Sequence, residues 1–134
     1  MGGRNVESGA GAATDTGNGS EQHLDLGHLA RQCHGDTALQ RDLLCLFQLQ
    51  AHALMGRIAV TLTEPGELAD IAHALRGSAL AIGATRVAVS AGALEAAARA
   101  TGDAGLGLSE AVATLEAEVA AVIAVSDRIS SAAD

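Results

Sequence analysis

The sequence predicts an all-α fold, namely an antiparallel four-helix bundle with a short extra helix at its N-terminal end. Hydrophobic residues make up 49% of the 134 residues, yet the aromatic share is 1%. A core of this composition is built from Ala, Leu, Val and Ile, and Ala and Leu favour helices over strands. Apolar residues recur at helical spacing in five segments, and no segment alternates with period two over the length of a strand.

Residues 1–22 are predicted to be a flexible, glycine-rich tail. This stretch holds six glycines, and Val6 is its one aliphatic residue larger than alanine. Such a segment cannot bury enough apolar surface to become ordered. The chain length fits one domain, so we expect the bundle to occupy residues 23–131.

The first helical segment is short, and we expect it to cover one end of the bundle. It ends near Gly35, and Asp36 or Thr37 is expected to cap the long segment that follows. The apolar stripe of the short segment comprises Leu26, Leu29, Ala30 and Cys33. The stripe of the long segment comprises Leu39, Leu43, Phe47, Leu54 and Ile58.

Three further segments complete the predicted bundle. The third begins around residues 63–65, because proline suits the first turn of a helix and acidic residues suit its positive end. The fourth follows Gly83, and the fifth follows a glycine-rich turn at residues 102–107 with Ser109 as its expected cap. The third stripe comprises Leu68, Ile71, Leu75, Ser78 or Ala79, and Ile82. The fourth comprises Val87, Ala91, Leu94 and Ala98, and the fifth comprises Val112, Leu115, Val119, Val122, Ser126 and Ile129.

Helical geometry turns His73 away from the predicted core. At about 100° per residue, the apolar stripe of the third segment lies between about 140° and 240° from this histidine. Arg76 falls at about −60° and Gly77 at about +40°, so a cation and an uncovered patch of backbone flank the imidazole. Glycine inside a helix costs about 1 kcal/mol relative to alanine. We expect Gly77 to keep the ring accessible, because a side chain there would crowd it.

Residues 73–84 resemble the signature of the histidine-containing phosphotransfer (HPt) domains of bacterial phosphorelays. That signature is roughly His-x-Leu, then Lys or Arg, then Gly-Ser, and after three residues a hydrophobic residue followed by Gly-Ala. It is matched at His73, Leu75, Arg76, Gly77, Ser78, Ile82, Gly83 and Ala84. The resemblance covers about residues 24–131 and includes Gly35 and Asp36, the Leu-x-x-Phe around Phe47, and Leu94–Arg99. It implies a four-helix bundle with an exposed, phosphorylated histidine midway along one helix.

The resemblance also assigns roles to individual residues. His73 is implied as the phospho-acceptor, and Arg76 takes the place of the usual lysine, with a planar fork of donors in place of a point charge. Glu95 stands 22 positions past the histidine, where several family members carry a Gln or Glu that hydrogen-bonds its Nδ1. That bond would hold the Nδ1–H tautomer and leave Nε2 free to attack phosphorus. Arg99 is either a second cation near the phosphoryl site or the i,i+4 partner of Glu95.

Leu80 departs from the family pattern. It lies at about −20°, almost directly on the His73 face, where relatives more often carry a small residue. Two explanations stay open: Leu80 packs on the start of the fourth helix, or it offers apolar contact to a docking partner.

Neither a metal site nor a cofactor belonging to the chain itself is expected. The other histidines, His23, His28, His34 and His52, lack a ligand-type spacing and are expected to be surface side chains. Asp70 and His73 have the spacing of some helical-bundle metal ligands, but such sites need inward-facing ligands from several helices. Cys33 and Cys45 are expected to be reduced and to lie in the core as small apolar residues.

The charge balance excludes several partners. The chain has 8 Arg and no Lys against 16 acidic residues, a formal net charge of −8, which matches neither nucleic acid nor an anionic membrane surface. No charge-free run of about 18 apolar residues exists, so no membrane insertion is expected. No secretory signal is recognised at the N-terminus, so a cytoplasmic location is expected.

The resemblance implies a stoichiometric phosphoryl carrier and not an enzyme, because motifs of a histidine-kinase ATP lid are missing and the chain should not phosphorylate itself. The expected partners are a hybrid sensor histidine kinase and response-regulator receiver domains, which would supply Mg²⁺, and the chain itself is expected to be a monomer. Two alternatives stay open. One is a receiver-binding helical module without phosphotransfer, which would need neither His73 nor Gly77. The other is an excised phosphotransfer domain of a chemotaxis-type kinase, which Glu95 fits, although Gly92 stands where those domains usually carry a second histidine.

Overall fold

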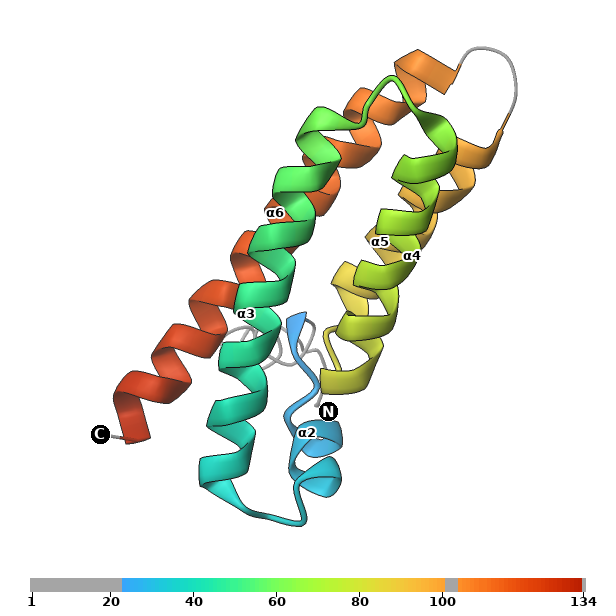
Figure 1. Ribbon diagram of the computed structural model, residues 1–134. Helices are drawn as coiled ribbons and strands as arrows, with labels where there is room; N and C mark the ends of the chain where they lie inside the picture. The colour runs from blue at the N-terminus through green and yellow to red at the C-terminus, as the bar shows by residue number, and fades with distance from the viewer. Residues whose placement is uncertain (1–22, 101–103, 134) are drawn as a thin grey trace, which may run out of the picture.

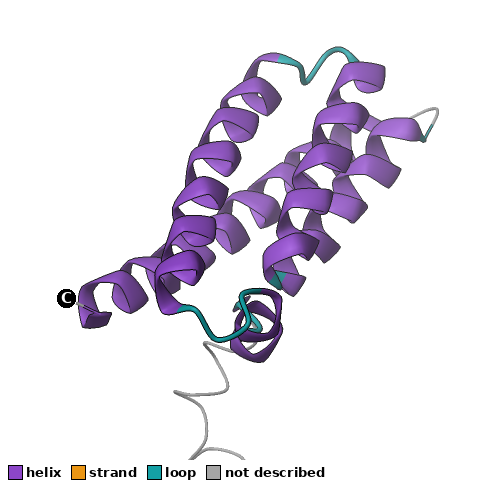
Figure 2. Cartoon of the chain, turned by 60° about the horizontal axis from the view of Figure 1, so that its bottom comes forward, coloured by secondary structure: helices purple, strands orange, loops and turns teal. Residues whose placement is uncertain are grey.

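The computed structural model describes residues 23–100 and 104–133, and over these residues the chain is helical with no strand (Figures 1 and 2). The helices are α2 (Leu26–Gln32), α3 (Thr37–Val60), α4 (Pro65–Ile82), α5 (Thr85–Arg99) and α6 (Ala104–Ala133). The all-α prediction is therefore confirmed. The tail predicted at residues 1–22 lies outside the described residues.

Helices α2 and α3 begin at aspartate caps. The carboxylate of Asp25 accepts a hydrogen bond from the backbone N–H of His28 at 2.9 Å. Asp36 does the same for the N–H of Leu39 at 3.1 Å, so Asp36 and not Thr37 caps α3. Helix α4 starts at Pro65 as predicted, because proline is preorganised for the first helical turn.

The long helices pack side by side around one hydrophobic core. Helix α4 packs against α3 and α5, and α6 packs against the same two helices. Helix α2 contacts α3 and α4 at the end of the molecule where α3 begins and α4 ends (Figure 1). The fully buried large side chains include Leu29 of α2, Leu44 and Ile58 of α3, Leu68 and Leu75 of α4, Leu94 of α5, and Leu115 and Val122 of α6. The predicted stripes of α4 and α5 thus form the core on which the solvent-facing residues are positioned.

The turn between α4 and α5 requires glycine at position 83. Gly83 ends α4 in the left-handed region at φ 83°, and its carbonyl oxygen accepts the N–H of Asp25 at 2.8 Å. A Cβ on Gly83 would lie 3.0 Å from the carbonyl oxygen of Asp25 and 3.1 Å from the ring of His28. The close approach of the α2 segment to this turn therefore depends on the missing side chain.

We expect Gly83→Ala to lower the free energy of unfolding by about 1–3 kcal/mol, since alanine is strained at this φ and displaces Asp25. Gly66→Ala is the matched control, because a Cβ at Gly66 has nothing within 4 Å and alanine favours a helix. Urea unfolding followed by circular dichroism measures both variants. Equal stability of the two alanine variants would contradict the close-packing argument.

Two expectations about α3 are wrong. Leu39 is 40% exposed, and Cys45 is exposed while Cys33 is buried as predicted. The buried side of α3 runs through Leu44, Phe47, Ala51 and Ile58. Apolar residues also occur on the other sides of this helix, so periodicity alone could not fix which of them face the core.

The start of α6 also differs from the prediction. The helix begins at Ala104, so Ser109 lies inside it and does not cap it. Glycine costs only about 1 kcal/mol in a helix interior, and burial of Leu108, which is 6% exposed, offsets part of that cost. The predicted glycine-rich turn is therefore helical from residue 104 onward.

Helix α3 is unusually apolar on its solvent side. By length and composition alone it is the one helix among the described residues that is long and apolar enough to cross a membrane. Core helices of water-soluble proteins also meet this criterion. In the structure only 22% of the most apolar 18-residue stretch of α3 is buried. The other helices therefore leave much of its apolar surface uncovered.

Candidate functional site

His73 lies on the solvent side of α4, as helical geometry predicts. Its side chain is 65% exposed, whereas Ile71, Ala72 and Leu75 on the opposite side of the helix are buried. The packing of α4 against α3 and α5 therefore presents the imidazole to solvent without using it in the core.

Glu95 of α5 lies beside the histidine. The Nδ1 atom of His73 is 3.2 Å from each carboxylate oxygen of Glu95. The side chain of Glu95 is 19% exposed, so the carboxylate lies in the seam between the two helices. An ionised carboxylate can only accept a hydrogen bond. The neutral ring therefore carries its proton on Nδ1, which leaves the lone pair on Nε2.

The contact also changes the acidity of Glu95. The hydrogen bond with His73 holds the pKa of the Glu95 carboxyl below its ordinary value. Partial desolvation opposes this effect, while charge attraction to the protonated form of His73, a hydrogen bond from Arg99 and the charge of Arg99 act in the same direction. A lowered pKa keeps Glu95 ionised and accepting at neutral pH.

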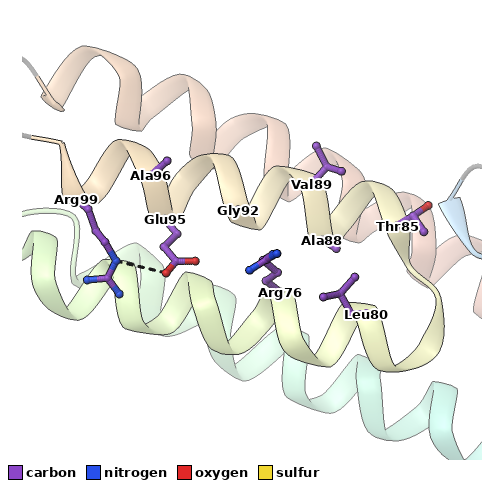
Figure 3. A pocket seen from close by; sticks show the side chains of 9 residues that line it. All are labelled: Arg76, Leu80, Thr85, Ala88, Val89, Gly92, Glu95, Ala96 and Arg99. Atoms are coloured by element: carbon purple, nitrogen blue, oxygen red, sulfur yellow. Dashed lines mark hydrogen bonds and ion pairs between the residues drawn. The ribbon is translucent and has the colours of Figure 1, made fainter.

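Arg99 bridges two carboxylates on neighbouring helices. Its Nε donates to Oε2 of Glu95 at 3.4 Å (Figure 3), and one of its terminal nitrogens lies 3.2 Å from Oδ1 of Asp70. Arg99 is thus the i,i+4 partner of Glu95, the second of the two roles considered for it. Asp70 was considered only as a metal ligand, although its i,i+3 spacing to His73 places both residues on one side of α4. Because Asp70 and Arg99 are exposed, this ion pair adds little stability.

Arg76 lies across Gly92 of α5 (Figure 3). A Cβ on Gly92 would be 3.6 Å from Cδ of Arg76 and 3.7 Å from its Nε, so the glycine leaves room for the arginine stem. Both residues line a groove of about 630 Å³ between α4 and α5 that Glu95 also lines. Within the described part of the chain no carboxylate pairs with Arg76, and its guanidinium remains available to an anion near His73.

Leu80 lies in the same groove and is 49% exposed. It faces Thr85 and Ala88 at the start of α5 (Figure 3). This position agrees with the first of the two explanations given for Leu80. Its exposed half leaves contact with a docking partner open as well.

Gly77 borders a different groove, of about 380 Å³, between α4 and α3. A Cβ on Gly77 would have nothing within 4 Å. The expectation that any side chain here crowds His73 is therefore wrong for a methyl group. The glycine instead leaves the helix surface open toward solvent on the α3 side of the histidine.

The remaining histidines divide into two pairs. His34 and His52 are exposed as predicted, but His23 and His28 are partly buried, because the segment that carries them packs onto the ends of other helices. His28 Nε2 lies 3.2 Å from the carbonyl oxygen of Ala81, and His23 Nδ1 lies 3.4 Å from Oε1 of Glu118. Among the described residues no group of three or more candidate ligands could hold a metal ion.

Comparison with known proteins supplies one family. Residues 42–125 match the family described as Hpt domain, and this range contains His73, Arg76, Gly77, Glu95 and Arg99. No curated protein and no solved structure matches the chain.

Proposed function

The chain belongs to the Hpt domain family, whose members are phosphocarrier modules of two-component signalling rather than catalytic enzymes, and we propose that it relays a phosphoryl group between receiver-domain aspartates through His73. The observation that carries this proposal is an exposed imidazole whose Nδ1 is held by Glu95 at 3.2 Å. A docking surface without phosphotransfer would need no such hydrogen bond.

In the proposed reaction, the lone pair on Nε2 of His73 attacks the phosphorus of an aspartyl phosphate on the donor receiver. The new P–N bond forms as the P–O bond to the aspartate breaks, and the aspartate leaves as a carboxylate. The proton on Nδ1 stays in place, so the ring becomes cationic and the carboxylate of Glu95 stabilises that charge. Transfer to the next receiver reverses these steps.

Arg76 is proposed to bind the phosphoryl oxygens. It lies three residues after His73, on the same side of α4, and it lines the groove that Glu95 also lines. Its planar fork can donate two hydrogen bonds to a phosphoryl group. Arg99 is proposed to act through Glu95, which it contacts, and Mg²⁺ is expected on the partner receiver domain.

We extend the proposal to the architecture and the partners. The neighbouring pairs α3–α4, α4–α5 and α5–α6 each pack together after a short connection, as antiparallel helices of a four-helix bundle do. The proposed domain spans residues 23–131. A hybrid sensor histidine kinase is the proposed donor and a response-regulator receiver the proposed acceptor, in the cytoplasm. The stem of Arg76 covers Gly92, where a chemotaxis-type domain would carry its second histidine.

The proposal is tested by incubating the purified chain with the phosphorylated receiver domains of its own host. At least one receiver should transfer its phosphoryl group to the chain, and the labelled chain should pass the group to a second receiver. A chain that binds receivers but acquires label from none of them would be a docking module, which overturns the proposal.

Gly77→Ala is expected to slow phosphotransfer without changing the His73–Glu95 hydrogen bond. The methyl group touches nothing in the free protein, but it would occupy space that an approaching receiver uses. Alanine should also raise the free energy of unfolding by up to about 1 kcal/mol. Stopped-flow transfer rates, ring NMR spectra and urea unfolding measure the three effects. Transfer at the wild-type rate would show that the glycine serves no access role.

A further inference from the structure

The solvent side of α3 carries an apolar stripe along the length of the helix. Leu49 is 66% exposed and Val60 is 77% exposed. At about 100° per residue the members of this stripe fall within an arc of about 80°, on the side of the helix opposite to its buried residues. The stripe comprises Leu39, Leu46, Leu49, Ala53 and Val60.

The spacing of this stripe is that of a helix-pairing seam. Leu39, Leu46, Ala53 and Val60 recur every seven residues, which is the period of a coiled coil. The second position of this repeat is held by Asp42, Leu49 and Gly56, so the seam is apolar with a charged residue near each end, Asp42 and Arg57. From Leu39 to Val60 the stripe is about 32 Å long, and a helix is about 10 Å wide. The largest apolar patches on soluble monomers are of this size and are often functional.

The stripe is complementary to itself in the antiparallel direction. When two copies of α3 cross with their centre between residues 49 and 50, Leu39 faces Val60 of the other copy and Leu46 faces Ala53. The same register places Asp42 of one copy opposite Arg57 of the other. Because the pairing is two-fold symmetric, the dimer contains two such charge pairs. Both side chains are exposed, so each is accessible to a partner.

The charge distribution favours a second copy over other occupants. The whole chain carries a net charge of −8, which opposes both self-association and binding to an anionic membrane. Helix α3 does not share this excess of negative charge, because its charged residues are Arg41, Asp42 and Arg57. Two copies that meet along α3 therefore avoid the acidic surface of α6, and the Asp42–Arg57 pairing favours a second copy of the chain as the partner.

We propose that α3 is a homodimerisation helix, and that two copies of this chain pair in antiparallel orientation along the stripe from Leu39 to Val60. This proposal differs from the expectation of a monomer. A single helix pair gives an interface at the small end of the known range, where weak complexes are found, and we expect a dissociation constant of about 10–100 µM. His73 lies on α4, so dimerisation can be measured without reference to phosphotransfer.

Sedimentation velocity of the full chain across a concentration series tests the proposal. The wild type should convert from monomer to dimer, and Leu49→Asp should weaken the dimer by about tenfold or more, because it places two carboxylates at the centre of the seam. Ala120→Asp is the matched control. It adds the same charge at an exposed position of α6 and should leave the dissociation constant unchanged.

A charge exchange tests the register. Asp42→Arg and Arg57→Asp should each weaken the dimer, and the double variant should restore it, since the pair re-forms with reversed signs. Arg57 also lies 3.8 Å from Glu67 within its own chain, so circular dichroism must first show that each variant is folded.

Two outcomes would overturn the proposal. A wild-type chain that remains monomeric at about 1 mM has no dimer of the proposed strength. If that monomer also co-sediments with phosphatidylglycerol vesicles and Leu49→Asp abolishes the binding, the face of α3 binds lipid. A double charge variant that stays as weak as its single parents excludes the antiparallel register.

Discussion

Replacing His73 by alanine is expected to abolish phosphoryl transfer from a phosphorylated receiver domain. The proposed reaction needs a neutral imidazole with its lone pair on Nε2, and Glu95 holds His73 in that tautomer at 3.2 Å. No other exposed histidine of the described residues has a carboxylate at its Nδ1. His34 and His52 are exposed but have no carboxylate partner. The side chain of His23 approaches Glu118 but is only 26% exposed, so it is less accessible to a receiver than His73.

The wild type should acquire a label that is labile in acid and stable in base, as a phosphoramidate is. His73→Ala should acquire none, although it should fold normally because the side chain is 65% exposed. His52→Ala, which removes an exposed histidine from α3, is the matched control and should be labelled like the wild type. Label on His73→Ala, or on a peptide that contains His52, would contradict the assignment.

Much of the fold and the exposure of His73 follow from helical periodicity. In α4 the stripe through Leu68, Ile71 and Leu75 is well separated from polar residues, so the buried side is unambiguous, and His73 lies opposite. In α3 the same reasoning misplaced Leu39, and the expectation that Cys45 lies in the core as a small apolar residue was also wrong. That helix is apolar on most of its circumference, and only contact with α4 and α6 decides which side is buried.

The contact of Glu95 with His73 was predicted from the family resemblance. Periodicity gives the direction of a side chain around its own helix, but not its position along the axis relative to a neighbouring helix. The contact of Arg99 with Asp70 and the placement of Arg76 over Gly92 depend on the relative rotation and offset of α4 and α5. These offsets are set by the tight turn at Gly83, where the α2 segment also docks. A sequence pattern that treats each helix separately contains no information about them.

Glu95→Ala is expected to slow phosphotransfer by about tenfold. Loss of the hydrogen-bonding partner that orients a metal-ligating histidine costs about 10–100-fold, and Glu95 orients His73 in the same way. Glu95→Gln should retain most of the rate, because its amide oxygen still accepts the hydrogen bond from Nδ1–H. The alanine variant should not be inactive, because the lone pair of His73 remains and the ring is exposed. Glu116→Ala, an exposed position on α6, is the control and should transfer at the wild-type rate.

Two NMR measurements test whether the slower phosphotransfer of Glu95→Ala results from the lost hydrogen bond to His73. Ring ¹⁵N shifts of His73 should show the Nδ1–H tautomer in the wild type and in Glu95→Gln, and a shift toward Nε2–H in Glu95→Ala. The carboxyl ¹³C shift of Glu95 should titrate below its ordinary range, and His73→Ala should raise that pKa because it removes the largest cause of the lowering. A carboxyl whose folded pKa is lowered contributes stability that is present above its unfolded pKa and is lost as the pH falls through the folded one. As the pH falls through the folded pKa of Glu95, the wild type should lose its rate advantage over Glu95→Ala. If the His73 ring shows the same tautomer in the wild type, Glu95→Gln and Glu95→Ala, then Glu95 is only a surface charge.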